Sequence, residues 1–234
     1  MRIIGVLDSG IGGLTTCCEI LKLIPSLNVI YYADNLNAPY GSKTADQVYR
    51  LAAAATEYLL GCGAELIVIA CNTATAAAVK RLRAEYGVPF VGIEPAVKPA
   101  FSSSGDILYL ATPLTVKCKN LDGCRVADTD CLATLIEAFS CNRNALDALA
   151  KKVVGNGADN IVLGCTHYTY LAESILRLYP EARVFDGGLG VARQVKRKLG
   201  AVYGRRGGTL FLHFSGRPDF RRYIDAFKSA EKFG

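Results

Sequence analysis

The chain has 234 residues, of which 51% are hydrophobic and 21% charged, and its formal net charge is +6. These proportions are typical of a soluble globular protein with one large or two small domains, and they argue against a disordered chain. No run of 18 or more apolar residues occurs, so we expect no membrane span. The N-terminus lacks the features of a signal peptide, so we expect a cytoplasmic protein.

Strands and helices alternate along the first half of the chain. The apolar run Ile3–Leu7 breaks at a glycine turn that predicts a following helix, and Thr44–Gln47 has the form of a capping box, which opens a helix that stops near Gly61. The other predicted elements are a strand at Val29–Tyr32, a loop at Ala33–Gly41, a strand at Leu66–Ala70, a helix at Thr73–Tyr86 and a strand at Phe90–Ile93.

The same alternation restarts after Ser102–Gly105. We expect strands at Ile107–Ala111, Asn160–Leu163 and Thr209–Phe214, and helices at Leu132–Phe139, Ala145–Val154, Ala172–Leu178 and from about Asp219. This order of elements predicts an α/β fold of parallel sheets with helices on both faces.

An internal repeat favours two lobes. The segment Gly63–Cys71 matches Gly157–Cys165 at a constant offset of 94 residues, and both follow the pattern Gly-Ala-acid-x-Ile-Val-aliphatic-small-Cys. We therefore predict two pseudo-symmetric lobes, each a mostly parallel sheet flanked by helices, with the active site between them. The first lobe comprises residues 1–94 plus 205–234, and the second comprises residues 95–204.

The cysteines are mostly expected to be free thiols. There are nine of them, no Cys-x-x-Cys pair occurs, and the chain has only two histidines, so no zinc site of usual spacing can be drawn. Cys71 and Cys165 differ from the rest because each directly follows a predicted buried strand and precedes polar residues. Buried structural cysteines are common, but ligands of open α/β sheets bind beyond the carboxyl ends of strands.

Two thiols at such positions favour two-base proton transfer, in which one group removes a proton from one face of a carbon while another protonates the opposite face. Both cysteines stand where a helix should begin, so we expect the helix dipole to favour their thiolate forms. The same helix ends offer backbone N–H groups to a substrate carboxylate.

Other polar residues are expected on the same rim. Asp8 and Ser9 end the first strand, and a phosphate loop is disfavoured there because Thr15 stands where a dinucleotide motif needs glycine. His167 follows Cys165 by two residues and suits charge changes near neutral pH. His213, inside an apolar strand, is predicted to be structural, whereas surface or linker roles would account for Glu94 and Glu137.

The basic residues gather towards the C-terminus. Between Arg193 and Lys232 eleven Lys/Arg residues stand against three acidic residues. Nucleic acid is one conceivable partner of such a run, but aromatic residues are not interleaved with it, so we interpret it as a solvated face and expect no nucleic-acid partner. On this reasoning, truncation of Arg221 or Arg222 leaves a distant active site nearly unchanged.

Four motifs together resemble the glutamate racemases of the aspartate/glutamate racemase superfamily: Asp8–Gly13, Ala38–Gly41, Ala70–Ala76 and Leu163–Tyr168. The resemblance implies glutamate bound between two lobes, no pyridoxal phosphate, metal or other cofactor, production of D-glutamate for peptidoglycan, and a homodimer. It implies that Cys71 serves the D-enantiomer and Cys165 the L-enantiomer, with assistance from Asp8 and His167. The substrate contacts that it implies are Asp8, Ser9, Tyr40, Gly41, Asn72, Thr73, Thr115, Thr166 and His167, with Thr112 also facing the substrate.

The chain departs from the family in one region. The segment Lys117–Phe139 is abbreviated, and residues 130–133 lack the usual Cys-Pro, which leaves open whether Glu137 is the family's auxiliary carboxylate. Two alternatives also stay open at this point. One is a racemase of the same superfamily that acts on aspartate or another 2-substituted acid. The other is a non-catalytic binding or regulatory protein on the same fold.

Overall fold

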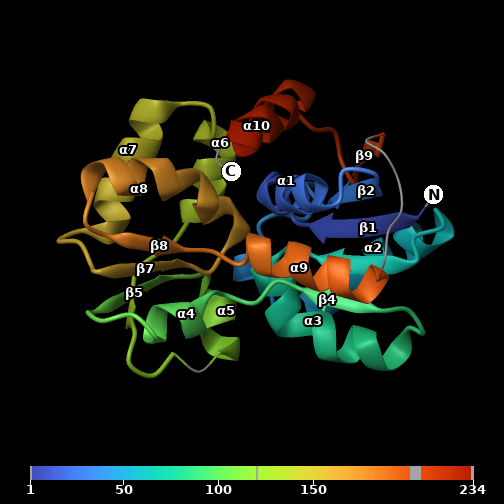
Figure 1. The fold of residues 1–234 in the computed structure, drawn as a ribbon, viewed down its shortest axis with the longest axis horizontal. Helices are drawn as coiled ribbons and strands as arrows, with labels where there is room; N and C mark the ends of the chain where they lie inside the picture. Colours follow the sequence, from blue (N-terminus) through green and yellow to red (C-terminus); the bar gives the residue numbers. More distant parts are fainter. Residues whose placement is uncertain (1, 120, 201–206, 233–234) are drawn as a thin grey trace.

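The computed structural model describes residues 2–119, 121–200 and 207–232, and it consists of two parallel β-sheets flanked by helices (Figure 1). The first sheet has the strand order β4-β3-β1-β2-β9, and every neighbouring pair is parallel. Its strands are β1 (Ile3–Asp8), β2 (Asn28–Ala33), β3 (Leu66–Ile69), β4 (Phe90–Gly92) and β9 (Leu210–Phe214). The last strand therefore joins the sheet that the first strand begins.

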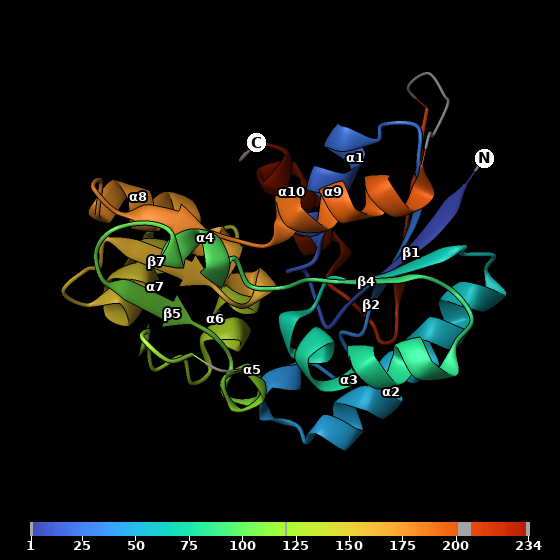
Figure 2. The ribbon, with the colours of Figure 1, turned by 60° about the horizontal axis from the view of Figure 1, so that its bottom comes forward.

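Helices cover both faces of the first sheet. Figure 2 shows α1 (Leu14–Leu23), α9 (Gly188–Leu199) and α10 (Phe220–Lys232) on one face, and α2 (Ala45–Gly61) and α3 (Asn72–Glu85) on the other. The predicted capping box is confirmed at the start of α2. The backbone N–H of Gln47 donates to Thr44 Oγ1 at 3.2 Å, and the Thr44 N–H donates to Gln47 Oε1 at 2.9 Å.

The second sheet has the order β6-β5-β7-β8 and is also parallel throughout. Its strands are β5 (Ile107–Leu110), β6 (Arg125–Val126), β7 (Asn160–Leu163) and β8 (Arg183–Phe185). The accompanying helices are α4 (Val97–Phe101), α5 (Pro113–Cys118), α6 (Leu132–Phe139), α7 (Arg143–Val154) and α8 (Ala172–Leu178). The predicted α/β fold with two parallel sheets is confirmed.

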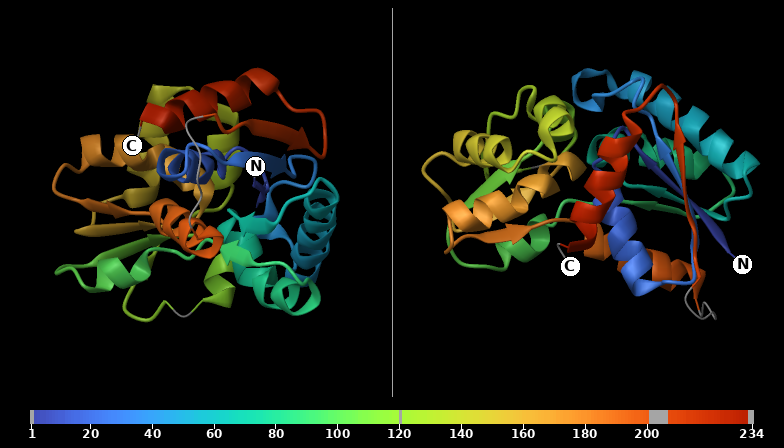
Figure 3. Two further views of the ribbon diagram at one scale, coloured as in Figure 1. Left: turned by 45° about the vertical axis from the view of Figure 1, so that its right-hand side comes forward. Right: turned by 90° about the horizontal axis from the view of Figure 1, so that it is seen from above.

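The two sheets lie side by side, and helices from late in the chain return to the first of them (Figure 3). Helix α9 packs on α1 and β4, although the predicted second lobe extends to residue 204. The packing of α9 favours an earlier boundary, and the predicted junction at residues 204 and 205 lies outside the described residues. No helix in the described ranges has both the length and the apolar character needed to cross a membrane.

Candidate active site

Cys71 lies at the carboxyl end of β3, where the chain turns into α3. It is the N-terminal capping residue of α3, and its Sγ accepts a hydrogen bond from the backbone N–H of Ala74 at 3.5 Å. Ser9, which follows β1, places its Oγ 3.9 Å from the same sulfur. Because β1 and β3 are adjacent parallel strands, Asp8 and Ser9 share one edge of the sheet with Cys71.

The protonation state of Cys71 differs from the sequence expectation. We expected the helix dipole to favour a thiolate, but burial raises the pKa of this thiol well above its ordinary value, and the carboxylate of Asp8 raises it further. The Ala74 N–H opposes this shift without cancelling it. The expectation is therefore wrong for Cys71, because desolvation outweighs the dipole. The raised pKa favours the neutral thiol at this position.

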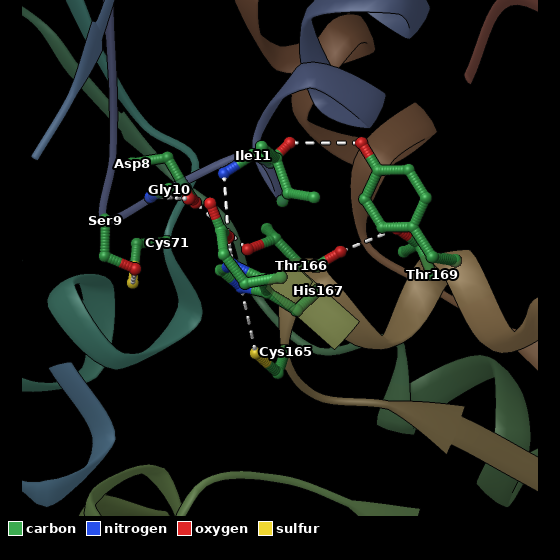
Figure 4. Close-up of polar contacts among 12 residues, drawn as sticks. Asp8, Ser9, Gly10, Ile11, Cys71, Cys165, Thr166, His167 and Thr169 are labelled. Atoms are coloured by element: carbon green, nitrogen blue, oxygen red, sulfur yellow. Dashed lines mark hydrogen bonds and ion pairs between the residues drawn. The ribbon is translucent and has the colours of Figure 1, made fainter. Parts of the chain in front are cut away.

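Cys165 occupies the matching position in the second sheet, directly before the 3₁₀ helix η2 (Thr166–Leu171) that follows β7. Its Sγ lies 3.9 Å from Nδ1 of His167 (Figure 4). The other ring nitrogen of His167, Nε2, lies 2.5 Å from Oε2 of Glu137 on α6, and the backbone N–H of Ile11 donates to that same oxygen at 3.2 Å. A continuous chain of contacts thus links Cys165, His167 and Glu137.

The charges in this chain of contacts support one another. Burial lowers the pKa of His167, but the contacts with Cys165 and Glu137 outweigh burial and leave that pKa well above its ordinary value. Burial acts in the opposite direction on Glu137 and raises its pKa. The hydrogen bond with His167 and the charge of that ring more than offset the effect of burial, so the net shift of the Glu137 pKa is downward. The pair is therefore an imidazolium and a carboxylate. The ring of His167 faces Cys165 through Nδ1, 3.9 Å from the sulfur.

Asp8 connects the two lobes beneath these sulfurs. Its Oδ1 accepts a hydrogen bond from the Gly10 N–H at 2.9 Å, and its Oδ2 accepts one from Thr166 Oγ1 at 3.0 Å. The glycine turn after β1 lies directly on η2, because a Cβ at Gly12 would be 2.5 Å from Thr166 Oγ1 and 2.7 Å from the His167 nitrogen. Glycine is required there for close approach of the two backbones.

A second inter-lobe contact consists of three threonine hydroxyls. Thr73 Oγ1 lies 2.8 Å from Thr112 Oγ1 and 3.3 Å from Thr115 Oγ1, and Thr112 lies 2.9 Å from Thr115. Beside them, both polar side-chain atoms of Asn72 are buried and have no hydrogen-bond partner among the described residues. Buried amides are normally paired, so an unpaired amide at this position is unusual.

A pocket of about 290 Å³ lies between the lobes, and both sulfurs line it. The predicted site residues on its wall are Ser9, Tyr40, Gly41, Cys71, Thr73, Thr112, Cys165 and His167. Four other predicted residues, Asp8, Asn72, Thr115 and Thr166, are buried behind this wall. The Tyr40 hydroxyl donates to Asp34 Oδ2 at 2.5 Å, so its proton is already engaged.

Sequence reasoning undervalued two residues of this pocket. Glu137, whose role the abbreviated segment left open, lies on the wall in contact with His167. Arg222 of α10 also lines the pocket, so the premise that it is distant from the site is wrong. Its neighbour Arg221 is exposed and does not line this pocket. No local sequence pattern indicates that Arg222 belongs to the site, because α10 reaches the pocket only through the return of β9 to the first sheet.

The remaining predicted features lie elsewhere. His213 of β9 stacks on Tyr58, with ring centroids 3.9 Å apart, and does not line the pocket. In the described ranges no group of three or more His, Cys, Asp or Glu side chains is arranged to hold a metal ion.

The chain is similar to amino-acid racemases, although no protein-family model matches it. It is 38% identical to the glutamate racemase of Halothermothrix orenii, over 96% of this chain and 98% of that protein. It is 40% identical to the glutamate racemase of Ectopseudomonas mendocina, over 84% of this chain and 82% of that protein.

Solved structures agree with these relatives. The Thermus thermophilus glutamate racemase in complex with β-chloro-D-alanine superposes with a TM-score of 0.79 at 28% identity, covering 99% of this chain and 92% of that one. The Escherichia coli glutamate racemase, in complex with L-glutamate and the activator UDP-MurNAc-Ala, gives 0.82 at 28% identity, covering 98% and 95%. The chain belongs to the glutamate racemase family and is an amino-acid racemase, an isomerase.

Proposed function

We propose that this protein interconverts L- and D-glutamate without a cofactor, using Cys71 and Cys165 as paired acid/base catalysts. The observation that carries this proposal is that two thiols, one from each lobe, line the same small pocket. Inversion of a carbon needs one proton acceptor and one proton donor on opposite faces, and the two sulfurs supply both.

The contacts of the two sulfurs suit conversion of the L-enantiomer. Cys165 lies against His167, whose pKa is raised, and acts as the base that takes the α-proton. The electron pair left on the α-carbon is delocalised into the adjacent carboxylate, and Cys71, a neutral thiol, donates its proton to the opposite face. One proton leaves the substrate and one arrives. The reverse reaction begins with Cys71 as the base and Cys165 as the acid.

The pocket offers groups for the charged ends of glutamate. The N-terminus of α3 and the unpaired amide of Asn72 suit a carboxylate, as does the hydroxyl of Thr73 on the wall. Ser9 and the backbone around Gly41 line another part of the same wall. Asp8, held by Gly10 and Thr166, orients the rim next to Cys71 and contributes negative charge near the substrate ammonium group.

The relatives favour glutamate over aspartate. The proteins at 38% and 40% identity are glutamate racemases. An aspartate racemase homologue from Pyrococcus horikoshii shares 16% identity with a TM-score of 0.52, which shows the fold alone. We further propose that the product D-glutamate serves peptidoglycan synthesis, that the protein works in the cytoplasm, and that it forms a homodimer, all of which rest on the family resemblance.

The test incubates the purified protein with each enantiomer of glutamate separately in the presence of a chelator. Chiral chromatography then measures how much of the opposite enantiomer forms. We expect conversion in both directions without additives, and much weaker conversion of aspartate. Activity that appears only after addition of a metal ion or pyridoxal phosphate would contradict the proposal. Faster conversion of aspartate would correct the substrate.

A further inference from the structure

Helix α10 brings a cation to the Cys165 side of the pocket. The helix packs on α1 of the first lobe, and residues near its N-terminus line a hollow together with residues 138–142, at the end of α6 in the second lobe. Arg222 and Glu137 line the same active-site pocket, and Arg222 is half-buried. The ion pair that Arg222 makes at the start of α10 is weak, since its Nη2 lies 3.7 Å from Oδ2 of the exposed Asp219, which precedes the helix.

Glu137 is surrounded by charged and titratable groups from three other elements. His167 and Tyr170 face it from η2, and Asp8 faces it from β1. Arg222 and Tyr223 face it from α10. The hydrogen bonds from Ile11 and His167 both reach Oε2 of Glu137. Arg222 is the cation in this group that does not belong to the Glu137–His167 pair.

We propose that Arg222 is a positioning residue for the Cys165 half of the reaction, and that it keeps Glu137 ionised and directed at His167. The inference rests on the proposed two-cysteine mechanism and deepens it. Arg222 lines the same pocket as Glu137, the last member of the chain of contacts that runs from Cys165 through His167. Cys71 lies outside this chain, because its own contacts come from Ser9 and Ala74.

The electrostatics agree with this geometry. Arg222 is one of the groups that lower the pKa of Glu137, after His167 and the Ile11 N–H. Removal of the Arg222 charge raises the pKa of Glu137. In an acid titration Glu137 is then protonated at a higher pH than in the unchanged protein. A neutral Glu137 no longer stabilises the His167 imidazolium. The low-pH limb of activity therefore moves to higher pH when Arg222 is neutralised.

The two halves of the reaction are separable with β-chloroalanine, whose D-enantiomer is the ligand of the Thermus relative. The thiolate removes the α-proton, the freed electron pair forms the Cα–Cβ double bond, and chloride leaves. The resulting aminoacrylate tautomerises to an imine that water hydrolyses to pyruvate and ammonium. In C71S only Cys165 remains to act on the L-enantiomer, and in C165S only Cys71 remains to act on the D-enantiomer.

The experiment adds R222Q, R222K or the neighbouring control R221Q to each single-cysteine variant and measures pyruvate release. With the L-enantiomer and C71S, we expect R222Q to lower kcat/KM about tenfold and R222K to restore most of it. With the D-enantiomer and C165S, we expect R222Q to change kcat/KM by less than about twofold. Equal losses on both sides, or equal effects of R222Q and R221Q, would overturn the inference.

A second readout does not depend on the cysteine variants. The pH profile of glutamate racemisation is measured for R222Q, R222K and R221Q in the otherwise unchanged protein. We expect the low-pH limb to move upward in R222Q alone. An unmoved limb would contradict the role of Arg222 while leaving the proposed function intact. Failure of the unchanged protein to racemise glutamate would instead contradict the proposed function.

Discussion

Gly12→Ala tests how closely the glycine turn and η2 must approach each other. An added Cβ would lie 2.5 Å from Thr166 Oγ1, 2.7 Å from the backbone nitrogen of His167 and 2.8 Å from the carbonyl carbon of Thr166. Ordinary contacts of this kind are at least 3.4 Å, so η2 must move by roughly 1 Å. Rotation of a side chain cannot relieve the clash, because two of the three atoms belong to the backbone.

We expect two separable effects of this change. Overpacking of a close contact typically costs about 1–3 kcal/mol, so urea denaturation should show a loss of stability of that size. A displacement of about 1 Å between catalytic groups is enough to lower turnover about a hundredfold, so kcat should fall by far more than the stability loss explains. The control is Gly61→Ala, because nothing lies within 4 Å of a Cβ at the end of α2. Normal stability and turnover of G12A would refute the inferred contact between the lobes.

Two further predictions concern charge and hydrogen bonding at the site. The Glu137–His167 pair stabilises the fold below the ordinary His pKa of 6.5, and this stabilisation is lost as the pH rises through the raised pKa of His167. E137Q should therefore cost more stability at about pH 6 than at about pH 10 in urea denaturation, and an equal loss at both would contradict the assignment. Y40F removes the hydrogen-bond donor of the buried Asp34 and should lower the free energy of unfolding by about 1–3 kcal/mol. Y49F removes the hydrogen bond to Glu85 at the surface and should lower it far less. Equal losses would rule out a special role for the buried bond.

The fold was largely predictable because its signals are local. Continuous apolar strands, the Thr44 capping box and the repeat that ends at Cys71 and Cys165 each reflect short-range physics, and the structure contains them where they were expected. The elements that sequence reasoning left out include β6, β8 and α9. The two strands are only two and three residues long and exposed or partly buried, which gives little hydrophobic pattern to detect.

The site was only partly predictable, because its remaining features depend on tertiary packing. The pKa of Cys71 is set by how deeply β3 and α3 are covered, which no local motif encodes. The partnership of Glu137 with His167 joins residues 30 positions apart on different elements. Arg222 reaches the pocket because β9 pairs with β2 and directs α10 across the interface.

The most direct test of the two-base mechanism measures incorporation of deuterium at the α-carbon of glutamate in D₂O by NMR. Each pure enantiomer is incubated separately with the unchanged protein, with C71S and with C165S. In the unchanged protein we predict that the product enantiomer carries deuterium while the remaining substrate initially keeps its hydrogen, since the two faces exchange with different thiols. In either variant interconversion should fall to background, because Ser is too weak an acid and base at neutral pH. A C165S protein that racemised glutamate at the unchanged rate would contradict the mechanism.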